Sequence, residues 1–182
     1  MNREDAIELV KENISKENLF KHMLAVEAIM KKTAKHLGED KEKWALTGLL
    51  HDIDFEKIKD HKEHGIVSEN ILKDKVDSEI IRAIKSHNFE NTGINPESKM
   101  DFALIAADAI SGLIIAAALI IPSKKLSDVK LESISKKFKQ KDFARNCNRE
   151  KILYCEEIGI SREKFFEISL KALQKISDEL GL

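Results

Sequence analysis

Hydrophobic residues recur at helical spacing, at i, i+3 or i+4 and i+7, along almost the whole chain. Only 7 glycines and 2 prolines interrupt the 182 residues, which leaves few of the turns that hairpins and sandwiches need. The pattern predicts an all-α fold, and the length fits a single domain over residues 1–182. The predicted helices cover residues 3–13, 15–37, 41–50, a segment opening at 60, then 77–88, 99–121, 127–139, 149–158 and 162–180.

Residues at the predicted helix ends support these boundaries. Ser15 and Ser161 are expected N-caps, whereas Gly38 and Gly159 are expected to end the helices before them. The segment Asp60-His61-Lys62-Glu63 has the form of a capping box. The residues Asn91-Thr92-Gly93 and Asn95-Pro96 predict a loop before the long helix, and Pro122 is expected to end that helix.

The most apolar segment, residues 102–121, has nearly the length of a membrane span but contains Asp108. A carboxylate near the centre of an inserted helix costs about 2.5–3.5 kcal/mol. The segment therefore predicts a buried central helix that carries one functional carboxylate. Because the N-terminus is charged and lacks an apolar stretch, we expect no secretory signal, no membrane partner and a cytoplasmic location.

The formal net charge of −1 gives no overall positive field, so we expect no nucleic-acid polymer as a partner. Cys147 and Cys155 lack a CxxC spacing and are expected to be free thiols in a reducing compartment. The sequence leaves the oligomeric state open, a homodimer included.

Four histidines, His22, His51, His64 and His87, lie on or beside the apolar faces of predicted helices. Each alone could be a hydrogen-bonded core residue. A carboxylate such as Asp108 in an apolar helix, however, costs several kcal/mol unless a cation or donors compensate it. One metal centre would satisfy these groups together, and imidazole with carboxylate suits zinc, iron, manganese, cobalt or nickel.

This ordered set of residues resembles the HD superfamily of metal-dependent phosphohydrolases. The resemblance lies in His22 of NLFKHMLAV, in His51 and Asp52 of LTGLLHDID, and in Asp108 of ALIAADAISG, and it spans Leu19 to about Ser111. It implies an HD-type helical bundle with its metal-site core at about 19–111, which helices within 127–182 complete.

The resemblance also implies a second metal, since many members of the superfamily use extra histidines. HGIVSENIL selects His64 over His61, and EIIRAIKSHN selects His87. His61 is then expected at the surface, although it could still reach the site. The implied ligands of one metal are His22, His51, Asp52 and Asp108; a second would lie on His64 and His87, with Asp52 bridging. We expect one or two divalent ions of manganese, iron, zinc, cobalt or nickel.

Two departures from the superfamily's patterns limit the substrate. Asn88 and the absence of a GYP motif make the cyclic-dinucleotide branch improbable. The common HDIGK form is replaced by HDIDFEK, so the usual lysine is absent and Asp54 and Glu56 stand nearby. Either acid could orient a water or protonate a leaving group, or simply be solvated. The candidate catalytic residues are His51, Asp52, Asp54 and Glu56.

Substrate phosphate needs cationic partners beyond the metals. The candidates are Lys124, Lys125, Arg145 and Arg149, any of which could instead be solvated. The expected function is hydrolysis of a phosphate ester of a nucleotide or small metabolite by metal-activated water, with a small molecule as the substrate. The alternatives are a di-iron HD-type oxygenase and a non-catalytic, metal-containing ligand-binding module.

Overall fold

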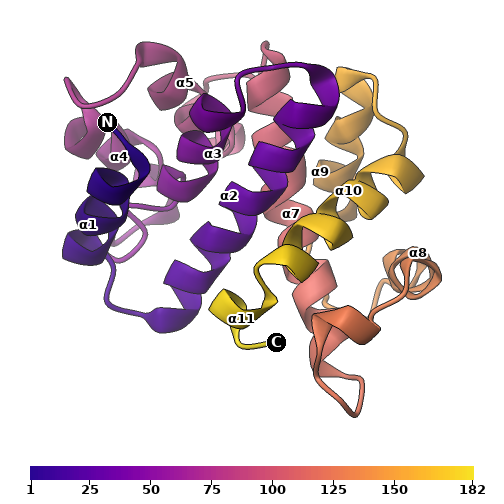
Figure 1. Cartoon of the computed structure of the whole chain (residues 1–182). Helices are drawn as coiled ribbons and strands as arrows, with labels where there is room; N and C mark the ends of the chain where they lie inside the picture. The colour runs from indigo at the N-terminus through magenta and orange to yellow at the C-terminus, as the bar shows by residue number, and fades with distance from the viewer.

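Every regular element of the chain is a helix, as the computed structural model shows for residues 1–182 (Figure 1). The all-α prediction is confirmed. The α-helices are α1 (Arg3–Asn13), α2 (Glu17–Leu37), α3 (Lys41–Leu50), α4 (Ile66–Leu72), α5 (Ser78–Ser86), α6 (Phe89–Thr92), α7 (Lys99–Leu119), α8 (Leu131–Lys139), α9 (Arg149–Ile152), α10 (Arg162–Lys175) and α11 (Ser177–Leu180). Three 3-10 helices join them: η1 (His61–Glu63), η2 (Leu126–Asp128) and η3 (Leu153–Ile158).

Helix α7 is the central helix of the fold. It packs against α2, α3 and α5 as well as α8, α9 and α10, so the two halves of the chain meet on it. By length and composition α7 could cross a membrane, but 67% of its most apolar window is buried among the other helices. A capping box between Ser98 and Asp101 fixes its start.

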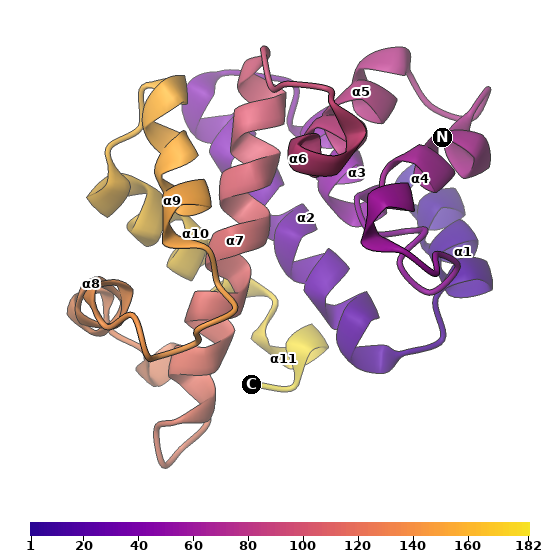
Figure 2. The same cartoon turned by 180° about the vertical axis from the view of Figure 1, so that it is seen from behind.

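Helices α2 and α3 make the closest contact of the N-terminal half. A Cβ atom on Gly48 would lie 2.9 Å from the backbone of Val26 and Glu27, so only glycine allows this approach. Glu27 is buried at the same contact, and Arg3 of α1 pairs with its carboxylate. In both views α2 crosses the middle of the molecule, with α7 on one side and α3 and α4 on the other (Figures 1 and 2).

Two helix starts in the N-terminal half differ from the prediction. Ser15 is not the N-cap of α2, because its amide and hydroxyl both donate to the Glu56 carboxylate, and Lys16 takes the cap position. The helix predicted from Asp60 is instead the short η1 followed by α4. Gly65, at φ 87°, separates the two, because this backbone angle interrupts a right-handed helix.

Three predicted boundaries in the second half of the chain also shift. Helix α7 ends at Leu119, before Pro122, and α8 begins only at Leu131, because residues 126–128 form η2. The last predicted helix breaks at Ile176, where the backbone leaves the helical region, and the short α11 then buries Leu180. The expected ends at Gly38 and Gly159 and the cap at Ser161 are confirmed.

Two further segments refine the prediction. Residues 149–158 are α9 followed by the 3-10 helix η3. Asn91 and Thr92 of the expected loop belong to the short α6 (residues 89–92), which Gly93 ends at φ 71°. A contiguous cluster of 43 buried residues, from Ala6 to Leu180, forms the core.

The close approach at Gly48 generates a stability prediction. Gly48→Ala should lower the free energy of unfolding by about 1–3 kcal/mol, because the new methyl group meets backbone atoms that cannot move aside. Gly112→Ala on α7 is the matched control, since its methyl group meets only the flexible Cys147 side chain, at 3.0 Å. Urea unfolding of the metal-stripped variants, followed by circular dichroism, measures both; equal losses would contradict the assignment.

Candidate metal centre

The six predicted metal ligands meet in one cluster between α2, α3, α5 and α7. Helix α2 supplies the first histidine, the end of α3 the His-Asp pair, the segment before α4 and the end of α5 one histidine each, and α7 the last carboxylate. These residues are His22, His51, Asp52, His64, His87 and Asp108. The structure therefore brings together residues that are up to 86 positions apart in the sequence (22 to 108).

One half of the cluster lies between α2 and α7. The Nε2 atom of His22 lies 3.2 Å from Nε2 of His51 and 3.2 Å from Oδ1 of Asp108. It also lies 3.6 Å from Oδ2 of Asp52. The Nε2 atom of His51 is 3.9 Å from Oδ1 of Asp108, which closes the group.

The other half lies between α4 and α5. The Nε2 atoms of His64 and His87 are 2.9 Å apart. Oδ1 of Asp52 lies 3.2 Å from the first and 3.7 Å from the second. The same oxygen lies 3.4 Å from Nε2 of His51. Asp52 therefore contacts both halves, as a bridging ligand must.

Each imidazole is held from behind through its Nδ1 atom. His51 Nδ1 donates to the carbonyl of Gly48 at 2.8 Å, and His87 Nδ1 donates to that of Ile84. A carbonyl can only accept, so Nδ1 carries the proton in both rings and Nε2 presents a lone pair to the cluster. These carbonyl acceptors were not identified from the sequence, and neither was Ser111, which contacts the Nδ1 atom of His22.

The remaining two rings have the same arrangement with side-chain partners. His64 Nδ1 donates to Oδ1 of Asp54 at 2.7 Å. His22 Nδ1 lies 3.2 Å from the Ser111 hydroxyl, which itself donates to the Asp108 carbonyl and so is free to accept. Ser111 stands three residues after Asp108, on the same face of α7, which is the one sequence signal that could have identified it.

The four Nε2 atoms form two pairs within hydrogen-bonding distance, and the lone pairs of each pair repel one another unless a proton or a cation lies between them. Zinc and similar ions bind nitrogen and carboxylate oxygen at about 2.0–2.2 Å, so ligand atoms on one ion lie about 3–3.6 Å apart. The observed separations of 2.9–3.9 Å match this spacing. The donor set therefore fits divalent transition metals.

The charge state of the metal-free cluster follows from the same contacts. Burial lowers the pKa of His51 to about 4, and the charge of Asp52 offsets this only in part. Burial also opposes protonation of His64, but hydrogen bonds to Asp52 and Asp54 outweigh it and raise its pKa to about 10. Burial lowers the pKa of His22, but its hydrogen bond with Asp108 and the charges of Asp108 and Asp52 together outweigh burial, so the pKa is raised. His64 therefore holds a proton at neutral pH when metal is absent.

Asp54 lies behind His64 and is buried, so the alternative of a solvated carboxylate is wrong. Its carboxylate is completely buried, and besides His64 it accepts bonds from the backbone amides of Gly65 and Ser68 at 2.8 and 3.0 Å. Burial raises its pKa, but these bonds more than compensate, so the pKa stays below its ordinary value. Asp54 thus supports His64 and the start of α4, and both of its oxygens are engaged in hydrogen bonds.

Glu56, the other acid of the HDIDFEK segment, lies outside the cluster. It accepts bonds from the amides of Ser15 and Lys16 and from the Ser15 hydroxyl, which joins the turn after α3 to the start of α2. Its expected catalytic role finds no support in these contacts.

Arg149 is also committed to backbone contacts. Its guanidinium donates to several carbonyls between Lys137 and Cys147 and so holds the loop after α8. Backbone carbonyls therefore surround the Arg149 guanidinium, which is not at an open anion-binding site.

The other three candidate cations are exposed. Lys124 and Lys125 follow α7, whose end lies about 16 Å beyond Asp108 at 1.5 Å per residue. Arg145 belongs to the loop of Cys147, which packs on Gly112, one turn of α7 beyond Asp108.

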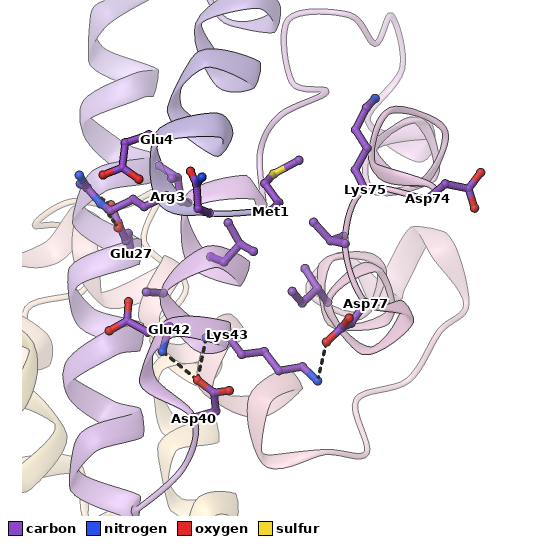
Figure 3. A pocket seen from close by; sticks show the side chains of 16 residues that line it. Met1, Arg3, Glu4, Glu27, Asp40, Glu42, Lys43, Asp74, Lys75 and Asp77 are labelled. Carbon is purple, nitrogen blue, oxygen red and sulfur yellow. Dashed lines mark hydrogen bonds and ion pairs between the residues drawn. The ribbon is translucent and has the colours of Figure 1, made fainter.

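The cluster is most accessible at its α2–α7 side. His51 is inaccessible, whereas the side chains of His22 and Asp108 are 25% and 34% exposed. A groove of about 720 Å³ lies elsewhere, between α1, α3 and the segment before α5 (Figure 3). None of the six cluster residues lines it, and its charges are largely paired, as Lys43 is with Asp77.

The position of Asp54 behind His64 predicts a specific loss of metal affinity. Asp54→Asn should weaken metal binding by about 10- to 100-fold, the usual effect of removing a partner that orients a ligand. Glu56→Gln, the control, should affect stability alone. Competition with a chromogenic chelator gives both affinities, and an equal effect of the two substitutions would exclude the orienting role.

The raised pKa values predict an unusual pH dependence of metal binding. A metal must displace the proton on His64, so affinity should rise about tenfold per pH unit for each proton displaced. Since that pKa is about 10, the rise should continue above pH 7.5, where ordinary histidines have already lost their protons. Chelator competition at several pH values between 6 and 9 tests this, and a plateau above pH 7 would be the contrary result.

Comparison with known proteins agrees with this geometry. A family model described as HD domain matches residues 19–118. Ribonuclease Y of Thermosipho melanesiensis is 33% identical over 135 residues, which cover 68% of this chain and 24% of that protein. Ribonuclease Y of Lawsonia intracellularis is 32% identical over 100 residues, covering 53% of this chain and 18% of that protein.

The chain therefore spans about a quarter or less of the length of these curated relatives. No solved structure matches it significantly. The family match covers more than half of the chain and includes all six cluster residues. The chain belongs to the HD domain family.

Proposed function

We propose that the protein is a two-metal phosphohydrolase that cleaves a phosphate ester of a nucleotide or small metabolite. The observation that carries this proposal is the convergence of four imidazole Nε2 atoms on Asp52 and Asp108, each imidazole held at its Nδ1 atom. Such rigid support is what a metal site requires, and a histidine that serves only packing does not need it.

The residues divide into two ligand sets that share Asp52. His22, His51 and Asp108 would hold one metal with it, and His64 and His87 the other. A bound metal pair supplies a water of lowered pKa and positive charge for the phosphate oxygens. Manganese, iron, zinc, cobalt and nickel all suit this donor set.

Residues in and around the cluster would position the substrate. The partly exposed edges of His22 and Asp108 mark the side from which an ester and a water would reach the cluster. Asp54 keeps His64 in place and has no free oxygen for proton transfer. Among the four candidate cations, Arg145 is the best placed to contact substrate phosphate, because its loop packs on α7 one turn beyond Asp108.

The curated relatives extend the range of substrates to consider. Both are named as a ribonuclease, so a phosphodiester of RNA is a candidate substrate in addition to the small-molecule esters expected from the sequence. The net charge of −1 still favours a short substrate over a long polymer. We therefore propose a nucleotide or a short oligonucleotide as the preferred class.

Replacement of the bridging carboxylate tests the proposal. Asp52→Asn should reduce ester hydrolysis by the metal-loaded protein at least about 100-fold, because both ligand sets lose a charge. Asp178→Asn, an exposed change on α11, is the matched control. Release of phosphate or nucleoside should be measured on mononucleotides, short RNA and nitrophenyl mono- and diesters, before and after chelation and reloading.

Two results would count against this function. If stripped and reloaded protein behave alike on the whole panel, the metal takes no part in hydrolysis. If metal removal lowers only the melting temperature and the parent protein cleaves nothing, the cluster serves a structural or ligand-binding role.

A further inference from the structure

Phe55 is an aromatic side chain at the edge of the metal centre that the proposed chemistry does not use. It lies three residues after Asp52, and its amide donates to the Asp52 carbonyl at 3.0 Å, so its position is tied to the bridging ligand. Its ring centre is 5.5 Å from that of His64, with the two planes at 87°. The ring thus lies against a ligand of the cluster.

A little over a third of Phe55 remains open to solvent. Phe55 is 37% exposed, and it is the one aromatic residue among the large hydrophobic side chains that are exposed. The others, such as Met1 and Ile120, lie at the N-terminus, at the start of α4 and at the end of α7. A phenyl ring gains stability by burial, so packing alone does not explain an open ring beside the cluster.

A second exposed ring accompanies it. The imidazole of His61 lies 5.8 Å from the Phe55 ring, at 56°. Its backbone is fixed, because the Asn88 side chain donates to the carbonyls of both His61 and His64 at 3.0 Å. His61 is therefore not in the cluster itself, and it forms an aromatic pair with Phe55 at the edge.

The sequence departs from the superfamily's pattern at this same position. His51-Asp52-Ile53-Asp54-Phe55 aligns with the HDIGK form, so Phe55 stands where that form has lysine. A cation there can meet a phosphate, whereas a phenyl ring offers a flat apolar face. Aromatic rings of this kind stack on nucleobases, and positioned rings lose little entropy when they do so.

We propose that Phe55 and His61 form a stacking surface for the base of a nucleotide whose phosphate lies at the metal centre. This inference rests on the proposed function and narrows its substrate to esters that carry a planar heteroaromatic ring. Free nucleotides and the terminal nucleotide of a short RNA share this chemistry. Phe55 acts in specificity, and it takes no part in the cleavage itself.

The test compares a nucleotide with a phosphate ester that lacks a ring. The ratio of kcat/KM for 5′-AMP to that for glycerol phosphate should fall roughly 5- to 150-fold in Phe55→Ala, mainly through KM. Phe55→Trp should retain most of the ratio, because it keeps a stacking face. Ile120→Ala, another exposed hydrophobic residue, is the control in which the ratio should not change. A parallel series with a dinucleotide shows whether free nucleotides or RNA ends are preferred.

Binding measurements separate this inference from the proposed function. If the parent protein hydrolyses no ester, the affinities of 5′-AMP and inorganic phosphate for the metal-loaded protein still report on stacking. Phe55→Ala should weaken 5′-AMP by the same factor and leave the phosphate affinity within about twofold. An equal loss for both ligands, or for 5′-AMP and glycerol phosphate in the kinetics, would overturn the inference, because Phe55 would then act only by supporting His64.

Discussion

Every imidazole of the candidate metal centre is held by a partner at Nδ1, and this contact leaves its Nε2 atom free to bind a metal or a proton. Gly48, Ile84, Asp54 and Ser111 provide the four acceptors. With the Nδ1 protons committed, the Nε2 lone pairs point at one another across about 3 Å. In metal-free protein the proton on His64 relieves this repulsion in its pair with His87, and a metal ion would take the place of that proton.

Two of these acceptors are backbone carbonyls at the C-terminal ends of helices. His51 and His87 are the C-cap residues of α3 and α5, and each bonds the carbonyl three residues before it. Helix ends leave such carbonyls without an intrahelical partner, so the two rings satisfy them at no expense to the helix. The close approach of α3 to α2 at Gly48 then brings His51 beside His22.

Helical periodicity predicted the helical class, because it is a local signal, and the resemblance to the HD superfamily implied the six residues that meet in the cluster. The sequence did not predict the roles of Asp54 and Glu56. Both follow the same His-Asp pair, and only the tertiary fold buries one behind His64 and turns the other toward Ser15. The interruption at Gly65 and the carbonyls around Arg149 were also missed, since each depends on a backbone conformation that the residue types do not reveal.

Anomalous X-ray diffraction from crystals of the metal-saturated protein tests whether the cluster binds a pair of metal ions. We expect two peaks about 3.5–4 Å apart with Asp52 between them, each bonded to histidine through Nε2. A metal bound through Nδ1, a peak on only one half of the cluster at saturation, or no peak beside Asp52 would contradict this expectation.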